Sequence, residues 1–358
     1  MPKRQHIRML RTSDGVNLAW ASGGSGPALV RASTWLTHLE EDWKSPVWRH
    51  WLDFLADHFQ VIRYDERGCG MSDWEVEDCS WERWQEDFHA VVDAAQPEKP
   101  FAILGVSQGA VAAIQYAHRH PENVSHLILC GAYARGWRKR DQSDGAQKFR
   151  AIVELTRLGW GQENPVYRQL FTARFVPEGT PEQLDWFNEL CVRTARPDVA
   201  ARLLEARAEP DVSGLLADIN VPTLVFHATH DEVVPLAEGR LLAARIPNAR
   251  FVQLESRNHI LLEQEPSWQR FKDEVLEFTG IAAAPGDEDP LFDVLSPRER
   301  EILVHVANGD TNTQIGVALS ISEKTVRNHM THIFEKLGVR SRAQAIVLAK
   351  DKHLSAER

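Results

Sequence analysis

The stretch FAILGVSQGAVAAIQ, residues 101–115, decides the fold of the larger part of the chain. An apolar, strand-like run leads into Gly105-Val106-Ser107-Gln108-Gly109, and a helical pattern begins at Ala110. The two glycines fit a strained turn, because side chains beside the projecting serine would collide with it. We therefore predict a strand, a sharp turn and a helix whose N-terminus favours negative charge near Ser107.

Short β-rich runs alternate with amphipathic helical patterns on both sides of this stretch. Such alternation predicts a mostly parallel sheet covered by helices on both faces, with functional loops at the carboxyl ends of the strands. The helical patterns include 48–58 and 110–120. The candidate strands are Ala28–Ala32, Gln60–Tyr64, Phe101–Gly105, His126–Cys130, Thr223–His227 and Arg250–Leu254.

Two further residues follow strands in an informative order. Asp231 lies in HATHDEVVP after one strand, and His259 lies in SRNHILL after the next. Together with Ser107 this resembles the α/β-hydrolase fold, in which nucleophile, acid and histidine follow in that order. The segment VIRYDERGCGMSD, residues 61–73, also resembles that fold, and the resemblance covers residues 10 to 280. It implies Ser107 as nucleophile, His259 as its base and Asp231 as the acid that orients the imidazole.

Each member of this triad has an alternative interpretation. Ser107 could hold a turn that now only shapes a pocket, and Asp231 could be a turn former, with Glu232 as the substitute acid. His227 and His230 are alternative candidates to His259 for the role of base. The sequence leaves these alternatives open.

The loop after the first predicted strand departs from the family pattern. Hydrolases of this fold usually have His-Gly there, whereas this chain has VRASTWL at residues 30–36. The resemblance implies backbone N–H groups of Thr34 and Gln108 as the oxyanion donors. Loss of one such donor can cost about 2.7–4 kcal/mol of transition-state stabilisation, so slow or absent turnover is compatible with an intact triad.

Residues 132–220 occupy the usual place of a helical cap, and their aromatic residues are expected to fill its core or cover an apolar ligand. We expect Trp35, Ser107 and His259 to line the ligand pocket. The basic run at 135–140 is interpreted as solvated surface, with binding of an acidic ligand or partner as the alternative.

A second group of signals lies at residues 295–349. Ser296, Pro297 and Glu299 form a helix-start pattern, and Ser322 caps a later helix that Gly338 closes. Two helices separated by the turn 320–322 follow helix-turn-helix logic.

The strings L-S-x-R-E-x-E-I-L, S-x-K-T-V-x-x-H and I-x-x-K-L-G-V make this segment similar to the LuxR-type output domain. Residues 313–314 are Thr-Gln where that family often has Lys-Glu. The resemblance implies that the third helix enters the major groove and that the fourth supports a dimer. The DNA-facing residues that it implies are Lys324, Thr325, Arg327, Asn328 and His329. The alternative is a helical interaction module that does not bind DNA.

Composition bounds the remaining possibilities. The chain has 358 residues, of which 43% are hydrophobic. No apolar run approaches the ~20 residues that span a bilayer, and the first residues lack the apolar stretch of a signal peptide. Its four cysteines lack metal-like spacing and are expected to be free thiols in the cytoplasm. No metal or cofactor is expected. Residues 291–358 carry 10 Lys and Arg against 8 Asp and Glu, whereas the whole chain has 41 against 51, so DNA contact should be confined to this end.

The predicted architecture is an α/β-hydrolase-like domain at 1–281, a linker at 282–290 and a small all-α helix-turn-helix domain at 291–358. This combination predicts a cytoplasmic one-component transcription regulator, a homodimer on double-stranded DNA, whose larger domain binds a small, partly apolar ligand. The alternative is an active serine hydrolase of esters, lactones or amides that destroys its own signal. Whether the chain is an enzyme is left open at this point.

Overall fold

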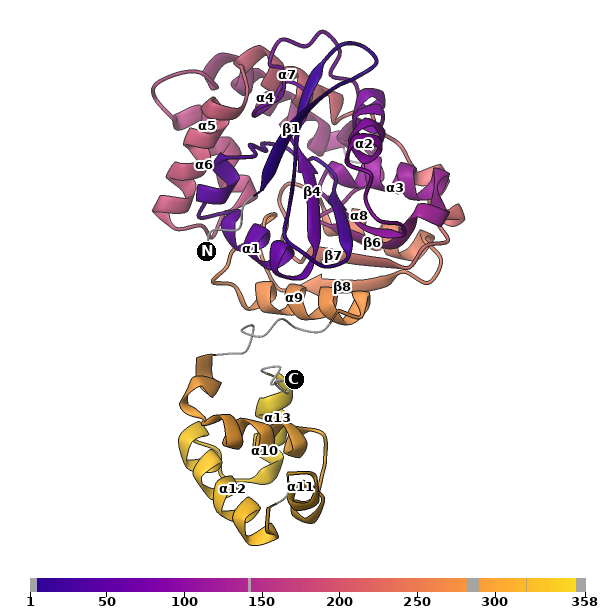
Figure 1. Cartoon of the computed structure of the whole chain (residues 1–358). Coiled ribbons are helices and arrows are strands. Elements are labelled where there is room, and N and C mark those ends of the chain that lie inside the picture. The colour runs from indigo at the N-terminus through magenta and orange to yellow at the C-terminus, as the bar shows by residue number, and fades with distance from the viewer. Residues whose placement is uncertain (1–4, 141–142, 282–289, 320, 352–358) are drawn as a thin grey trace. The chain divides into compact units, whose positions relative to one another are not determined.

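Eight strands of the larger unit form one mixed sheet in the order β1-β2-β4-β3-β5-β6-β7-β8 (Figure 1). The computed structural model describes residues 5–140, 143–281, 290–319 and 321–351. The six strands β3 to β8 run parallel to one another, while β1 and β2 add an antiparallel edge next to β4. The strands are β1 His6–Arg11, β2 Asn17–Gly23, β3 Ala28–Arg31, β4 Gln60–Tyr64, β5 Phe101–Val106, β6 Val124–Cys130, β7 Thr223–Ala228 and β8 Arg250–Leu254.

Helices cover both faces of this sheet. Helices α2 Trp81–Ala95, α3 Gly109–Arg119 and α8 Leu236–Arg245 share one apolar core with Val225 of β7. The neighbouring Phe226 instead packs against Phe271 of α9 Pro266–Thr279, with ring centroids 4.7 Å apart, and Phe271 lies 4.7 Å from Trp51 of α1 Arg49–His58. Because successive strand residues point to opposite faces, α1 and α9 cover the other face.

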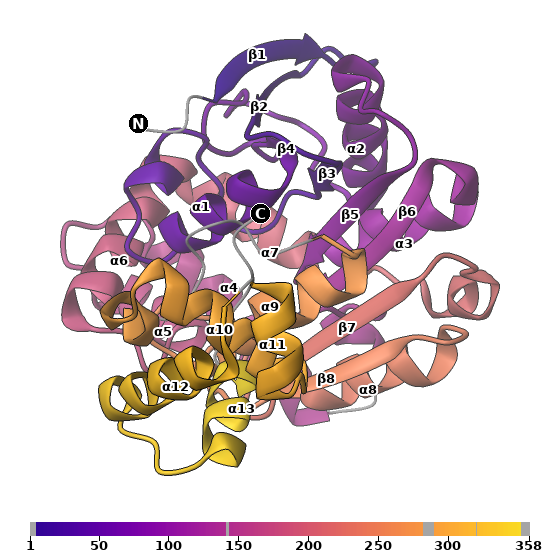
Figure 2. The same cartoon turned by 60° about the horizontal axis from the view of Figure 1, so that its bottom comes forward.

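The segment between β6 and β7 supplies the cap. Its helices are α4 Ser143–Gly159, α5 Val166–Phe175, α6 Pro181–Thr194 and α7 Pro197–Ala206, which lie together in both views (Figures 1 and 2). The ends of the expected cap range belong elsewhere: Ala132, Tyr133 and Ala134 join the sheet core, as does Leu216 of η4 Ser213–Asp218. The cap helices are therefore confined to 143–206, because these flanking apolar side chains find their partners on α3 and the sheet.

The chain divides into two units, Met1–Ile281 and Ala282–Arg358. The expected linker lies outside the described residues except for Pro290, which begins η5 Pro290–Val294. None of the described helices is long and apolar enough to cross a membrane. All four cysteines are free and buried.

Four helices form the second unit: α10 Pro297–Ala307, α11 Asn312–Ala318, α12 Glu323–Leu337 and α13 Arg342–Asp351. Ser296 and Glu299 form the predicted capping box, Ser322 accepts from the N–H of Thr325, and Gly338 ends α12 with a φ of +66°. These caps satisfy backbone groups that helix ends leave without partners. The turn residue Ser320 lies outside the described residues. The core is made by Phe292, Ile302, Leu303, Val306, Ile315, Val326, Met330, Ile333 and Ala345, together with their neighbours.

Candidate active site and nucleic-acid interface

Ser107 occupies a strained turn between β5 and α3. Its φ is +52°, a left-handed value that costs an L-residue about 1–2 kcal/mol. A Cβ at Gly105 would lie 2.8 Å from the α-carbon of Ala110, and one at Gly109 would lie 2.9 Å from the carbonyl oxygen of Ser33. Both glycines are therefore required by close backbone packing, which places the serine at the carboxyl edge of the sheet.

Asp231 and His259 form a buried pair at the same edge. The Nδ1 of His259 lies 2.6 Å from one oxygen of Asp231, and the other oxygen accepts from the N–H groups of Val233 at 2.8 Å and Val234 at 2.9 Å. Burial raises the pKa of Asp231, but the charge and hydrogen bond of His259 outweigh this and hold the pKa below its ordinary value. The carboxylate is thus fixed in the orientation that an acid–histidine pair requires.

The end of β6 brings Ser107 and His259 to one place. The N–H of Ser107 donates to the carbonyl of Cys130 at 2.9 Å, and a Cβ on the next residue, Gly131, would lie 2.9 Å from Cε1 of His259. The structure shows no hydrogen bond between the Ser107 hydroxyl and the imidazole, and the Nε2 of His259 has no partner among the described residues. Catalytic hydrogen bonds often tighten only when a substrate is bound, so this spacing alone leaves the nucleophilic role open.

The competing side chains have other partners. The Nε2 of His227 lies 2.9 Å from the carbonyl of Val234 and 3.8 Å from Asp231, and burial lowers its pKa. His230 is exposed and lies 3.6 Å from Glu255, whereas Glu232 is paired with Arg257 at 3.3 Å. Only His259 among these histidines contacts Asp231 at hydrogen-bond distance.

A buried polar network holds the residue after the serine. The side-chain amide of Gln108 donates to Glu66 at 2.9 Å, and the Nε of Arg207 donates to the amide oxygen of Gln108. Arg207 also contacts Glu66 at 3.3 Å. Burial raises the pKa of Glu66, although Arg207 and Gln108 act in the opposite direction. Gln108 is therefore fixed beside the expected oxyanion position.

The other expected oxyanion residue, Thr34, is 3% exposed. The carbonyl oxygens of the two residues before it in the loop, Ala32 and Ser33, pack against Gly109. This loop also contains Leu36 at a φ of +57°. Neither Glu66 nor Arg207 was predicted from the sequence as part of the site. Glu66 lies in the hydrolase-like segment 61–73, and this resemblance could have predicted its place in the site. No sequence motif around Arg207 indicates that it belongs to the site.

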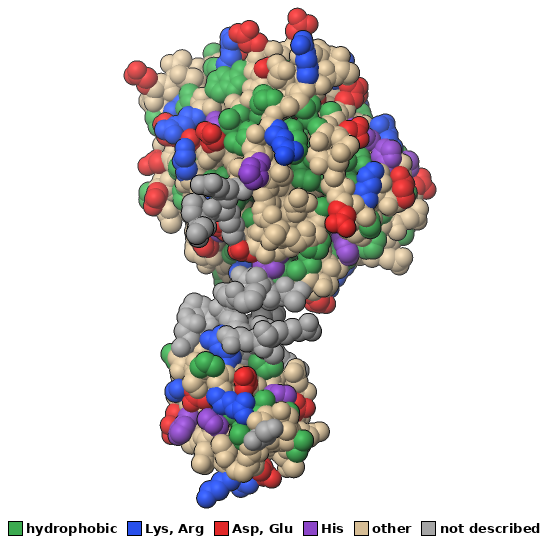
Figure 3. Space-filling model, viewed as in Figure 1, with side chains coloured by type: hydrophobic (Ala, Val, Ile, Leu, Met, Phe, Trp, Pro, Cys, Tyr) green, Lys and Arg blue, Asp and Glu red, His purple; other side chains and the backbone are tan. Residues whose placement is uncertain are grey.

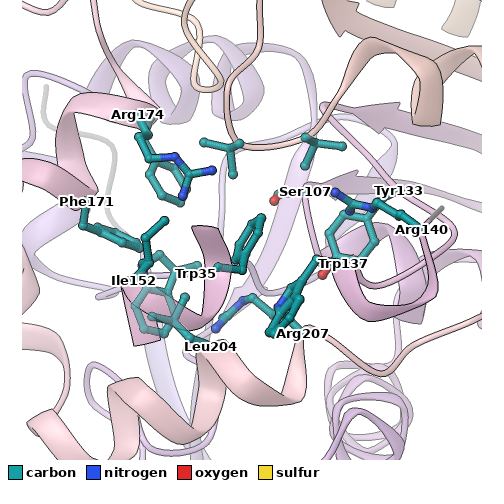
Figure 4. Close-up of a pocket in the computed structure, with 14 residues that line it drawn as sticks. Trp35, Ser107, Tyr133, Trp137, Arg140, Ile152, Phe171, Arg174, Leu204 and Arg207 are labelled. Carbon is teal, nitrogen blue, oxygen red and sulfur yellow. The ribbon is translucent and has the colours of Figure 1, made fainter. Parts of the chain in front are cut away.

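A cavity lies over Ser107, between the sheet and the cap (Figure 4). The space between the lining atoms, including the open mouth of the cavity, has a volume of about 490 Å³. Side chains fill the cavity closely, so the centre of a water molecule can occupy only about 40 Å³. Trp35 lines it as expected, whereas His259 is not a lining residue because its ring packs edge-on against Phe175, 5.4 Å away. The remaining lining residues are Tyr133, Trp137, Arg140, Phe149, Ile152, Phe171, Arg174, Phe175, Leu204, Arg207, Val233 and Val234.

The cap sets the approach to the histidine. Phe175, the last residue of α5, also accepts backbone hydrogen bonds through its carbonyl from the N–H groups of His259 at 2.8 Å and Ile260 at 3.2 Å. Movement of α5 would therefore be felt directly at the imidazole. The described residues contain no cluster of His, Cys, Asp and Glu suited to a metal ion.

The second unit presents the first turns of α12 to solvent. Lys324, Arg327 and Asn328 are exposed, whereas Thr325 and His329 are half-buried. Arg327 is paired with Glu323 at 2.8 Å, so contact with a phosphate or base would exchange one partner for another. Figure 3 shows basic and acidic side chains mixed over the visible faces of both units. Buried Val326 and Met330 face the core and fix the orientation of the helix.

Comparison with known proteins gives separate matches to the two units. The model described as bacterial regulatory proteins of the luxR family matches residues 293–349, and the model described as serine aminopeptidase S33 matches residues 49–266. A 3-oxoadipate enol-lactonase 2 from Acinetobacter baylyi is 26% identical over 269 residues, covering 73% of this chain and 93% of that protein. A probable HTH-type transcriptional regulator, GfsR of Streptomyces halstedii, is 50% identical over 62 residues, covering 17% of this chain and 25% of the regulator.

Solved structures of hydrolases match about three quarters of the chain. A hydrolase from Pseudomonas aeruginosa PA01 superposes with a TM-score of 0.63 and 27% identity, covering 77% of this chain and 98% of the other. An enol-lactonase from Burkholderia xenovorans LB400 gives a TM-score of 0.60 at 24% identity, over 76% of this chain and all of the other, which speaks for the fold alone. The chain therefore belongs to the α/β-hydrolase family described as serine aminopeptidase S33, and carries a LuxR-type helix-turn-helix unit at its C-terminal end.

Proposed function

We propose that this chain is a one-component transcription regulator whose hydrolase-like unit is a receptor for a small, partly apolar ligand. The observation that carries the proposal is the aromatic-walled cavity over Ser107 in a chain that also carries a LuxR-type DNA-binding unit. The regulator acts in the cytoplasm as a homodimer on double-stranded DNA, because helix-turn-helix units usually pair on two half-sites. The exposed apolar Val347 on α13 supports that pairing.

Ligand binding must distinguish two conformations to regulate DNA binding. The cavity wall combines core residues such as Ser107 with cap residues such as Phe171 and Leu204. A ligand between them favours one placement of the cap helices over another. The difference between the ligand's binding free energies for the two placements sets how far the ligand can change the affinity of the dimer for DNA.

A second function is favoured by one specific observation, the 2.6 Å contact between His259 and Asp231. In this reading Ser107 attacks the carbonyl carbon of an ester, lactone or amide while His259 takes the hydroxyl proton. The N–H groups of Thr34 and Gln108 then stabilise the oxyanion, the leaving group departs with that proton, and water releases the acid from the serine. The absence of the His-Gly pattern from the loop at residues 30–36 favours the receptor instead.

Intact-mass labelling with a serine-reactive fluorophosphonate separates the two functions. The receptor function predicts no adduct on the folded full-length chain, with Ser107→Ala indistinguishable from the parent. One adduct on the parent and none on Ser107→Ala would establish an activated nucleophile and support the hydrolase.

Selection of duplexes from a random DNA library tests the regulator itself. The full-length chain should enrich a two-fold symmetric site, and Arg327→Ala should weaken that binding. Removing another exposed positive charge, from the cap, in Lys148→Ala should leave DNA binding unchanged. Unchanged affinity and salt dependence in Arg327→Ala would support the interaction module that does not bind DNA.

A further inference from the structure

Three arginines lie around the cavity over Ser107. Arg140, Arg174 and Arg207 line it from different directions, as Figure 4 shows, and none of the described lining residues is an aspartate or glutamate. They come from three segments: the end of the basic run 135–140, helix α5 and the residue after α7. The cavity wall is therefore positively charged and otherwise largely aromatic and aliphatic.

The three guanidinium groups differ in how their charge is compensated. Arg207 lies 3.3 Å from the carboxylate of Glu66. Arg140 donates through Nε to the backbone carbonyl of Arg135 at 2.8 Å, and Arg174 donates to the backbone carbonyl of Glu232 at 2.7 Å. In the part of the chain that the structure describes, neither Arg140 nor Arg174 has a carboxylate within ion-pair distance.

Their surroundings are mainly aromatic. The guanidinium carbon of Arg140 lies 4.9 Å from the ring centroid of Tyr133, and that of Arg174 lies 5.0 Å from that of Phe149. Burial lowers the pKa of both arginines. Asp231 acts in the opposite direction on both, but its carboxylate is already bound by the imidazole and two backbone N–H groups.

Two other carboxylates act on these arginines, and each is paired with a different arginine through one of its oxygens. Glu238 raises the pKa of Arg140 but is paired with Arg135 at 2.7 Å. Glu232 raises the pKa of Arg174 but is paired with Arg257 at 3.3 Å. Among the described residues, each carboxylate that acts on Arg140 or Arg174 therefore has another partner, and the cavity lining holds no acidic side chain.

Buried hydrogen-bond donors without partners among the described residues line the same cavity. The buried groups with no partner among the described residues include one terminal nitrogen of Arg207, the Nε1 atoms of Trp35 and Trp137, and the hydroxyl of Tyr133. Arg207 is 8% exposed, and all four residues line the cavity. Arginine and indole nitrogens only donate, so a ligand that satisfies them must offer acceptors.

We infer that the cavity binds a small organic carboxylate, with its charged end at Arg140 and Arg174 and an aromatic or aliphatic body against Trp35 and Phe171. This inference rests on the receptor proposed above and names its ligand class. Guanidinium groups match the planar, two-oxygen geometry of a carboxylate. The limited free space favours a body of a few carbon atoms over a large lipid.

Titration calorimetry on the full-length chain tests the charge directly. The probes are phenylacetate, 3-phenylpropionate, hexanoate and octanoate, each paired with its own primary amide, and phenylphosphonate. The carboxylates should bind roughly tenfold or more tightly than their amides, since charge-assisted hydrogen bonds are about twice as strong as neutral ones. Binding of no carboxylate, equal binding of amides, or tighter binding of phenylphosphonate would overturn the inference.

Variants locate the charged end. Arg140→Gln and Arg174→Gln each retain a side-chain donor but remove the charge, and each should weaken carboxylate binding roughly tenfold while leaving amide binding unchanged. Arg138→Gln is the matched control, because Arg138 lies in the same basic run but is exposed and paired with Glu209. Equal losses in all three variants, or no loss in either cavity variant, would contradict the assignment. Trp fluorescence spectra of each variant establish that it is folded.

The affinity for a selected DNA duplex, measured with and without each probe, separates this inference from the proposed function. Carboxylates that bind but leave DNA affinity unchanged would refute the regulatory role while the ligand class stands. Amides that change DNA affinity as strongly as carboxylates would support the regulator and refute the carboxylate.

Discussion

Glu299→Gln should remove a pH-dependent part of the stability of the DNA-binding unit. The carboxylate of Glu299 is 5% exposed, lies 2.6 Å from the Nζ of Lys336, and accepts from the N–H of Ser296 at 2.8 Å. It therefore joins the start of α10 to the last turn of α12. Burial acts to raise the pKa of Glu299, but Lys336 and the capping box outweigh it and lower the pKa from 4.5 to about 2.

The sign and size of the effect follow from this difference. A carboxyl whose pKa is lower in the folded state stabilises the fold above its unfolded pKa, and this contribution is lost as pH falls through the folded pKa. Lowering the pKa from 4.5 to about 2 corresponds to about 3 kcal/mol. Because Lys336 is 39% exposed, solvent screens part of the interaction, and we expect about 2 kcal/mol.

Hydrogen exchange measured by mass spectrometry gives the free energy of opening of α10 and α12 in the full-length chain. The parent should exceed Glu299→Gln by about 2 kcal/mol at pH 6, and the difference should shrink steadily between pH 4.5 and pH 2. Glu335→Gln, an exposed carboxylate on α12, is the control and should show no such difference. A parent–variant difference that is the same at pH 6 and pH 2.5 would refute the reasoning.

Three further predictions concern the two sites and the second core. Gly131→Ala should lower the thermal unfolding temperature of the larger unit, because Gly131 has a φ of +55° and its added Cβ would lie 2.9 Å from Cε1 of His259. Gly214→Ala, with nothing within 4 Å of its added Cβ, should unfold like the parent, and equal unfolding temperatures of the two variants would contradict the packing argument. Lys324→Ala should lower the log–log salt slope of DNA binding by about one, a change that filter binding between 50 and 200 mM salt detects, and an unchanged slope would place this lysine away from phosphate. Ile302→Ala should destabilise the second unit by about 2–5 kcal/mol and reduce its helical circular dichroism without changing Trp fluorescence, because all 12 tryptophans precede residue 281; a fluorescence transition would show that the units unfold together.

The sequence predicted most of the regular structure because the strands and caps carry local signals. All six expected strands are present, and the cap serines and Gly338 stand where their backbone geometry requires them. The antiparallel strands β1 and β2 were not predicted. The side chains of β1 are mostly exposed or half-buried, so it lacks the apolar run or alternation that marks a strand.

The positions of the three proposed triad residues relative to the strands were predictable from the order of motifs along the chain. Ser107, Asp231 and His259 each stand just after a strand, and parallel strands end at the same edge of a sheet. The position of His259 behind Phe175 was not predictable, because it depends on where the cap helix α5 packs.

The sequence by itself determined the two units, the strained serine turn and the capped helices, since each depends on residues within a few positions of one another. Tertiary structure alone decided the charge of the cavity. Arg140, Arg174 and Arg207 are separated by more than thirty residues each, and no periodicity relates them. Their convergence follows from packing of the cap on the sheet, which buries aromatic side chains and brings three cations to one cavity as a consequence.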